Sequence, residues 1–262
     1  MTEKPPPDWV IPKRTIAVAT MQRSGSNLLG ELISQSDRLG HPGEYFSSHV
    51  LKVIAPGRGK TIIDRCLIAR ERGESTNGVV GIKFFPEQFP TPRTGIRFSE
   101  WFGTPTWIRL RRRDVLGQSI SFVMARQQQA FISAATPKFD PVYSAEDISR
   151  TISELCVRDG RWSAYFARIG IEPLEIVYED LEEDPERAIK AIAAAAEIDL
   201  GDFRLAPPRR FQKQRTALNQ EWRERFLKEM GDPDLFSAPG RPVRGWLGSI
   251  LYRTQPQPRP RK

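Results

Sequence analysis

The sequence predicts one α/β domain of three layers, in which a central, mainly parallel sheet lies between helices. Two observations predict this class. Short apolar, β-branched runs alternate with longer amphipathic segments, which is the pattern of parallel strands joined by helical crossovers. The length of 262 residues suits a single such domain and is ample for a hydrophobic core.

Four apolar runs are the expected strands, and helical periodicity lies between them. The run after residue 184 begins Asp-Pro, and proline suits the first turn of a helix. The expected strands are residues 15–19, 78–85, 106–110 and 174–179. The helical patterns cover residues 28–33, 53–71, 116–131, 146–169 and the segment from 184 onward.

Composition separates the two ends of the chain from its body. Residues 1–14 are rich in proline and are expected to form a flexible arm, ahead of a domain over residues 15–240. The formal net charge is +8, and residues 241–262 carry six basic and no acidic side chains. This basic tail is expected to be partly disordered, with at most peripheral contact to a membrane surface. Because the charge is concentrated there, we expect no nucleic-acid partner for the body.

The loop after the first strand, residues 22–27, has the composition of an anion-binding site. Gly25 allows close approach of the backbone, Arg23 supplies a fixed charge, and Ser24 and Ser26 add hydroxyl donors. The N–H groups of the following helix favour an anion at the same place. The alternative is a serine-rich turn that only caps the helix. Neither GxxxxGK[ST] nor GxGxxG is present, which disfavours P-loop kinases and dinucleotide-binding proteins.

Other cations lie where the next strands end, and parallel strands end at one edge of a sheet. Lys83 is near the end of the second strand, and three arginines, residues 111–113, follow the third. With Ser119 or Ser121 these arginines would bind a second phosphate through bidentate hydrogen bonds. A solvated basic turn is the alternative. The spacing leaves open which arginine acts, because Arg111 to Ser119 and Arg113 to Ser121 are equally separated.

Residues 40–50 hold candidates for a general base. Glu44 and both histidines of the chain, His41 and His49, lie in this segment. A carboxylate or imidazole beside an anion site is suited to remove a proton from a substrate. The alternative is a surface loop with ordinary titratable groups.

The cysteines and histidines indicate the redox compartment and whether a metal is expected. Cys66 and Cys156 are far apart and form no CxxC, so a reducing compartment, the cytoplasm, is expected. Cys156 lies on a helical apolar pattern and is expected to be buried. No apolar run is long enough to span a membrane, and no signal-peptide pattern opens the chain. With two histidines and no ligand spacing, no metal is expected.

Six segments resemble, in order, the landmarks of the Stf0-type bacterial carbohydrate sulfotransferases of the sulfotransferase superfamily. The similarity spans most of residues 15–230 and implies a P-loop-like fold. One departure is Asn27, where threonine is usual. The segments are QRSGSNLL (22–29), GHPGEYF (40–46), GIKFF (81–85), RRRDVLGQSIS (111–121), VYEDLEEDP (177–185) and QRTALNQEWRERF (214–226).

The resemblance implies the donor 3′-phosphoadenosine-5′-phosphosulfate (PAPS), without a metal, and a hydroxyl acceptor on a carbohydrate or glycolipid. Relatives of this type can dimerise. Donor contacts implied by matching positions fall on four parts of the chain. These are Gln22, Arg23, Ser24, Gly25, Ser26 and Asn27 at the phosphosulfate; Arg111, Arg112 or Arg113 with Ser119 or Ser121 at the 3′-phosphate; Tyr178 at the adenine; and Arg215 with Asn219 over the nucleotide.

The same resemblance places the catalytic base at Glu44. His41 competes for the role, but the Gly–Pro–Glu–aromatic pattern favours Glu44. Arg23 would stabilise the leaving oxygen, with Lys83 as a helper. The rival functions are an ATP-dependent small-molecule kinase and a basic nucleic-acid-binding protein.

Overall fold

The computed structural model describes residues 2–90, 95–128, 140–206 and 217–232. Within these residues it contains one four-stranded sheet in the order β2-β1-β3-β4, with every pair of neighbours parallel. The predicted α/β class and parallel sheet are confirmed. The strands are β1 (Arg14–Ala19), β2 (Val79–Phe84), β3 (Thr106–Arg111) and β4 (Leu174–Val177).

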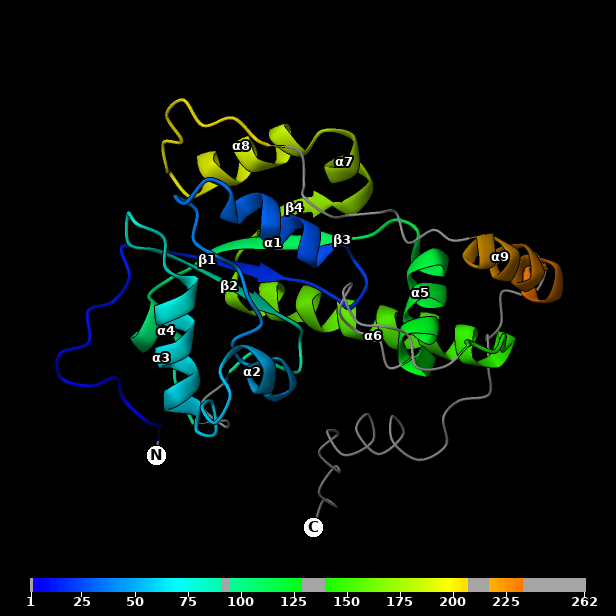
Figure 1. Cartoon of the computed structure of the whole chain (residues 1–262), viewed down its shortest axis with the longest axis horizontal. Coiled ribbons are helices and arrows are strands. Elements are labelled where there is room, and N and C mark those ends of the chain that lie inside the picture. The colour runs from blue at the N-terminus through cyan, green and yellow to red at the C-terminus, as the bar shows by residue number, and fades with distance from the viewer. Residues whose placement is uncertain (1, 91–94, 129–139, 207–216, 233–262) are drawn as a thin grey trace, which may run out of the picture.

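Helices cover both faces of the sheet, as Figure 1 shows. Successive strand residues point to opposite faces, so Ile16 and Val18 enter one core while Ala17 and Ala19 enter the other. The first core is closed by α1 (Ser26–Ser34) and α8 (Pro185–Ala195). The second is closed by α3 (Ile62–Gly73), α4 (Phe98–Phe102) and α6 (Ala145–Ile169).

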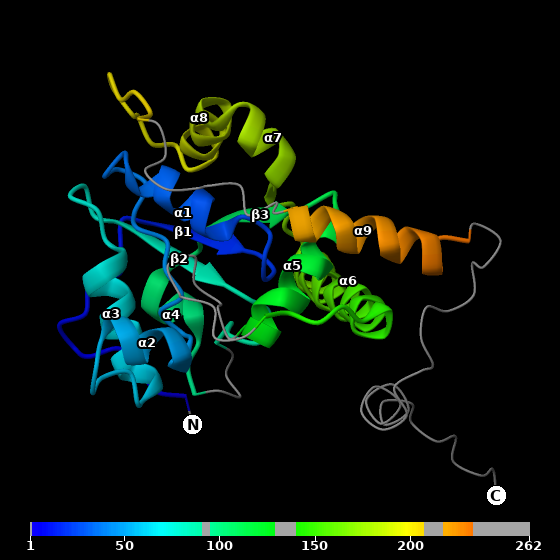
Figure 2. The same cartoon turned by 45° about the vertical axis from the view of Figure 1, so that its right-hand side comes forward.

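A third group of helices lies beyond the carboxyl ends of the strands. There α5 (Val115–Gln128) and α9 (Ala217–Met230) pack on α6, in the part of the molecule seen at the right of Figure 2. Trp222 and Phe226 of α9 are buried against Ile120 and Met124 of α5. The packing holds α9 beside the loops that follow the strands. The remaining helices are α2 (Ser48–Ile54) and α7 (Tyr178–Glu183).

Three details differ from the sequence predictions. The fourth strand ends at Val177, because Tyr178 already begins α7. The helical pattern predicted over residues 53–71 divides between the end of α2 and α3. The expectation that Cys156 is buried is wrong: its side chain is exposed on α6, whereas the adjacent Leu155 is buried. Consecutive helical residues point about 100° apart, so Cys156 falls off the buried stripe.

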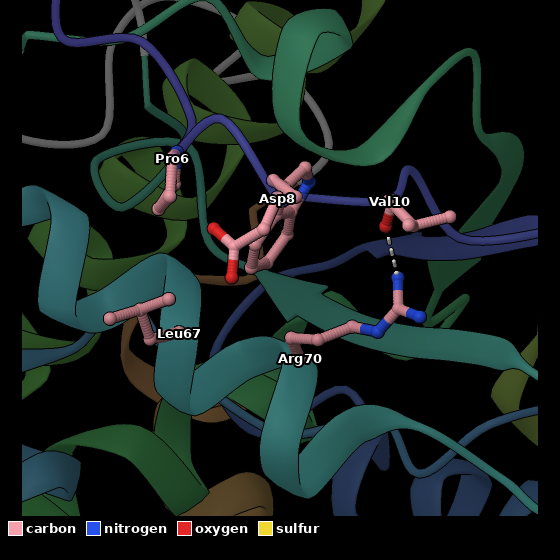
Figure 3. Close-up of a pocket in the computed structure, with 6 residues that line it drawn as sticks. Pro6, Asp8, Val10, Leu67 and Arg70 are labelled. Atoms are coloured by element: carbon pink, nitrogen blue, oxygen red, sulfur yellow. Dashed lines mark hydrogen bonds between the residues drawn. The ribbon is translucent and has the colours of Figure 1, made fainter.

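The N-terminal segment, residues 2–13, forms neither helix nor strand and lies against α3 and α4. The indole of Trp9 donates to the Trp101 carbonyl at 2.8 Å. In Figure 3 Arg70 reaches the Val10 carbonyl, at 2.9 Å, across a surface hollow. The predicted flexibility of this arm stays a prediction. No helix among the described residues has both the length and the apolar character needed to span a bilayer.

Candidate active site

The strand order brings several loops to one edge of the sheet. From β1 the chain passes to β2 on one side, and from β2 it crosses back past β1 to β3 and β4 on the other side, so the strand order reverses between β1 and β3. Ligands of open α/β sheets bind at the carboxyl side of such a switch point. Of the residues predicted from sequence, the loop after β1, Lys83 near the end of β2, the arginines that end and follow β3, and Tyr178 after β4 lie at this edge.

The loop after β1, residues 20–25, is held in shape by its own polar groups. Arg23 and Gly25 have φ values of 60° and 87°, and such left-handed turns aim successive N–H groups to one side. The Ser24 hydroxyl is buried and donates to the Met21 carbonyl at 2.7 Å. It also lies 2.6 Å from the Thr20 hydroxyl. Ser24 therefore shapes the loop, and α1 begins directly behind it.

Gln22 is fixed by three neighbours. Its side chain accepts from Arg158 of α6 at 2.9 Å and donates to Glu87 at 2.9 Å. Its carbonyl accepts from the Gln118 side chain of α5 at 2.7 Å. These contacts connect the loop after β1 to two helices and to the loop after β2. Nothing in the sequence pattern singled out Glu87, Arg158 or Gln118.

Gly25 provides room for a neighbouring aromatic ring. A Cβ added at this position would lie 2.1 Å from Cδ2 of Tyr178, the first residue after β4. Such a distance is far inside van der Waals contact, so an alanine here would displace the ring. The left-handed φ of 87° also favours glycine. Gly25 thus allows the loops after β1 and β4 to meet.

Arg23 lies between the loops after β1 and β3. Its Nε donates to the Ser121 hydroxyl at 2.9 Å, and its carbonyl accepts from Arg112 at 3.1 Å. Burial, and then the charge of Arg112, hold the pKa of Arg23 below its ordinary value, with Tyr178 acting in the opposite direction. The local electrostatics therefore favour an anion at this place.

The three consecutive arginines point to different places. Arg111 ends β3 and pairs with Asp159 at 3.3 Å and with Glu175 at 3.6 Å, on the side facing α6. Arg113 is exposed and pairs with Asp180. Arg112 alone of the three contacts the loop after β1. Neighbouring side chains of extended backbone point to opposite sides, which separates Arg112 from Arg111, whereas Arg113 lies beyond the strand in a bend.

Arg112 is largely buried, with 11% of its side chain exposed. Its guanidinium lies 4.9 Å from the centre of the Tyr178 ring. Its Nε is buried and makes no hydrogen bond, although the carboxylate of Glu179 is 3.8 Å away. Of the two predicted serines, Ser121 meets Arg23, whereas Ser119 is buried and donates to the Val115 carbonyl within α5. The structure brings together Arg23, Arg112 and Ser121.

Glu44 is mounted on the edge of the sheet. Its segment runs beside β2, where Gly43 forms a parallel bridge with Ile82 and accepts from the Lys83 amide at 2.9 Å. The carboxylate of Glu44 lies 3.2 Å from the Lys83 ammonium. Main-chain bonds to β2 therefore set the position of Glu44.

Lys83 connects Glu44 to the start of α1. Its ammonium donates to Asn27 Oδ1 at 2.7 Å and to the Ser26 hydroxyl at 3.4 Å, in addition to its contact with Glu44. An ammonium has three N–H donors, and these three acceptors match that number. Burial lowers the pKa of Lys83, while the charge and hydrogen bond of Glu44 oppose the shift. The Lys83 side chain therefore connects the Glu44 carboxylate to the start of α1.

Comparisons with known proteins identify the family of this chain. Residues 15–229 match the model of a family described as Stf0 sulphotransferase. The chain belongs to the Stf0 sulphotransferase family. It is 28% identical over 260 residues to trehalose 2-sulfotransferase of Mycobacterium tuberculosis (strain ATCC 35801 / TMC 107 / Erdman), covering 82% of this chain and 95% of the relative.

A second relative is trehalose 2-sulfotransferase of Mycolicibacterium smegmatis (strain ATCC 700084 / mc(2)155). It is 26% identical over 254 residues, covering 81% of this chain and 94% of the relative. Among solved structures, the sulfotransferase domain of the Synechococcus PCC 7002 olefin synthase aligns over 99% of this chain and 94% of that domain. The TM-score is 0.44 and the identity 16%.

In this Stf0-family chain the histidines lie apart from the Lys83 contacts. The ring of His41 contacts Asp37 at 3.2 Å, and its carbonyl accepts from the Tyr45 hydroxyl at 2.7 Å. His49 lies in the first turn of α2. Glu44 is therefore the candidate base that the structure places against Lys83, which in turn contacts the start of α1.

The closing element of the Stf0 resemblance is only partly described. Asn219 lies in the first turn of α9, whereas Arg215 falls outside the described residues. One helical turn after Asn219, Arg223 donates to Asp114 at 2.7 Å. Asp114 also accepts from the Gly117 amide at 2.9 Å and so caps α5. The described residues contain no cluster of three or more His, Cys, Asp or Glu side chains suited to a metal.

Proposed function

We propose that this Stf0-family sulfotransferase moves a sulfuryl group from PAPS to a hydroxyl of a carbohydrate, with Glu44 as the general base. The observation that carries the proposal is the double contact of Lys83 with Glu44 and Asn27. It keeps a candidate base one side chain away from the anion-binding loop. The names of the two trehalose 2-sulfotransferase relatives support a sugar acceptor, and a glycolipid would present the same hydroxyl chemistry.

The residues present fit an anionic nucleotide. The buried Nε of Arg112 without a hydrogen-bond partner is the clearest sign, because a buried donor normally has one. We assign the 3′-phosphate to Arg112 with Ser121, the 5′-phosphosulfate to residues 22–27, and the adenine to the side of Tyr178. Arg215 and Asn219 remain predicted contacts over the nucleotide. PAPS would supply the activated sulfuryl group.

The protein's own groups have distinct tasks in this proposal. Glu44 accepts the proton of the acceptor hydroxyl, which makes the oxygen a better nucleophile. Arg23 and the N–H groups at the start of α1 stabilise negative charge on the leaving oxygen. Lys83 holds the Glu44 carboxylate in place through their 3.2 Å contact. Its direct help at the leaving oxygen stays a prediction.

Single-turnover transfer from saturating PAPS to trehalose tests the assignment. Replacing Glu44→Gln should lower the rate by about a hundredfold to ten-thousandfold, the usual contribution of a general base. His41→Ala is the matched comparison and should retain near-normal turnover. Calorimetry with 3′,5′-bisphosphoadenosine should give similar affinity for both variants. Near-normal turnover of Glu44→Gln would refute Glu44 as the base.

The donor class has its own test. Thermal unfolding should shift upward with 3′,5′-bisphosphoadenosine and not with ATP and Mg²⁺, because a ligand stabilises the state that binds it. A larger shift with ATP and Mg²⁺ would favour the rival kinase function. If trehalose accepts no label, a screen of sugars and glycolipids with labelled PAPS identifies the acceptor.

A further inference from the structure

Both carboxylate oxygens of Glu44 have partners, and the second partner is a residue that the sequence did not mark. Oε1 lies 3.2 Å from the Lys83 ammonium. Oε2 accepts from the Nε2 amide of Gln88 at 3.4 Å. Hydrogen bonds at catalytic groups are often long in ligand-free proteins and shorten when substrate binds. The Glu44 side chain, 17% exposed, is therefore held at two points.

The orientation of the Gln88 amide is fixed independently. Its Oε1 accepts from the main-chain amide of Phe85 at 3.3 Å. Because that oxygen faces a donor, the Nε2 group must be the one that faces Glu44. Two contacts of opposite polarity thus agree on one orientation of the side chain. The main-chain N–H of Gln88 donates to the Phe85 carbonyl at 2.9 Å, which closes the turn after β2.

The neighbouring residue connects the same turn to the donor side. Glu87 accepts from the Gln22 side chain at 2.9 Å and lies 3.7 Å from Arg158 of α6. Adjacent residues of one turn therefore touch the candidate base and the loop after β1. The turn that carries Gln88 is therefore held by contacts to Glu44 on one side and to Gln22 on the other.

We infer that Gln88 is a positioning residue for Glu44, directing the carboxylate toward the acceptor hydroxyl by a neutral hydrogen bond. This inference rests on the proposed function, since it assumes that Glu44 is the base. A neutral donor orients the carboxylate without adding a second positive charge. A second charge of that kind would make the carboxylate a weaker proton acceptor.

Few charged groups face Glu44. Among the described residues, Glu44 contacts Lys83 of β2 and the neutral Gln88 of the turn after β2, and Lys83 in turn contacts the neutral Asn27 and Ser26 at the start of α1. A change of charge at residue 88 should therefore act directly on the ionisation of the base.

Gln88→Glu separates positioning from a merely structural role. The new side chain keeps an oxygen for the Phe85 amide but replaces the donor to Glu44 with a like charge. We expect the acid limb of the kcat profile to move up by about one pH unit, a rate about tenfold lower on that limb. The affinity for 3′,5′-bisphosphoadenosine should stay within about twofold, since Gln88 is assigned no donor contact. A structural role alone predicts an unmoved profile.

Two further variants complete the experiment. Gln88→Met removes the donor without adding charge and should move the acid limb in the same direction by a smaller amount. Gln35→Glu is the matched control, because Gln35 also accepts from a main-chain amide, that of Ala206 at 2.9 Å, at the other end of α1. It should leave the profile unchanged.

The outcomes distinguish this inference from the proposal beneath it. If Glu44→Gln loses turnover while Gln88→Glu and Gln88→Met follow the wild-type profile, the role of Gln88 is refuted and the base assignment stands. If Glu44→Gln turns over normally with the acceptor that the screen identifies, the base assignment itself fails, and the inference with it.

Discussion

At the end of β2, Glu44 and Lys83 lie 3.2 Å apart and offset each other's charge. At the ends of β1 and β3, Arg112 donates to the main chain of Arg23 and its charge lowers the pKa of the Arg23 side chain, although Glu179 and Asp114 lie 3.8 and 4.0 Å from Arg112. The first region, which we call the base side, is electrostatically complete without a ligand. The second, which we call the donor side, is expected to be stabilised when an anion enters. Changes at the donor side should therefore alter nucleotide binding, whereas changes at the base side should alter kcat.

The largest effect on binding is expected from Gly25→Ala on the donor side. The added methyl would meet the Tyr178 ring at 2.1 Å, in a backbone conformation with φ of 87°. Strain of about 1–2 kcal/mol for a left-handed residue, together with the displaced ring, should weaken 3′,5′-bisphosphoadenosine binding by about a hundredfold. Isothermal calorimetry measures the change.

Gly57→Ala is the control for that variant. Gly57 has a similar φ of 80°, but a Cβ there meets no atom within 4 Å. Gly57→Ala introduces a similar backbone strain but no contact with a neighbouring side chain, so it should leave nucleotide affinity unchanged. Equal affinities for Gly25→Ala and Gly57→Ala would show that the approach of Tyr178 to the loop is unimportant for binding.

A smaller effect should follow from removing one arginine. Arg112→Ala should weaken 3′,5′-bisphosphoadenosine binding by about 10- to 100-fold, as expected for a charge-assisted hydrogen bond of about 1.5–3 kcal/mol. Arg113→Ala removes the same charge from an exposed pair with Asp180 and should cost about twofold. A larger loss for Arg113→Ala would reverse our assignment of the 3′-phosphate.

The smallest effect, on the free energy of unfolding, is expected from Asp114, which accepts a hydrogen bond from Arg223 of α9. Burial favours a higher pKa for Asp114, but hydrogen bonds from Arg223 and the Gly117 amide outweigh it and leave the pKa below its ordinary value. Its stabilisation is thus present above about pH 4 and lost as pH falls through the lower folded-state pKa. Asp114→Asn should lower the free energy of unfolding by about 1 kcal/mol at pH 7.

Urea denaturation at pH 7 and at pH 3 measures this difference. The gap between wild type and Asp114→Asn should shrink at the lower pH, because the wild-type carboxylate then binds its proton. Asp180→Asn, which breaks an exposed pair, should show little difference at either pH. A gap of equal size at both pH values would mean that Asp114 stabilises α9 by packing and not by charge.

Local patterns in the sequence were enough to predict the sheet and the segments at its edge. Apolar runs placed each strand to within about two residues, since burial on both faces requires continuous apolar sequence. The loop of residues 22–27 and the candidate base Glu44 were identifiable because their motifs are contiguous. The end of β4 was less visible, since Tyr178 suits a strand as well as a helix start.

What sequence could not give was the partner of each polar side chain. Arg111 points away from the loop because it forms ion pairs with Asp159 and Glu175. Both acids come from distant parts of the chain. Gln88 and Arg158 likewise act through contacts that depend on tertiary packing. The one local signal for Gln88 was that it closely follows a strand ending at the predicted ligand-binding edge.

The bridge between Gly43 and Ile82 has a consequence for how such an enzyme diversifies. The proposed proton acceptor, Glu44, is attached to β2 by main-chain bonds that precede α2, so its place does not depend on the surface segments that come after it. If those outer segments were exchanged during evolution, a different acceptor hydroxyl could be bound. The position of Glu44 relative to β2 would stay the same.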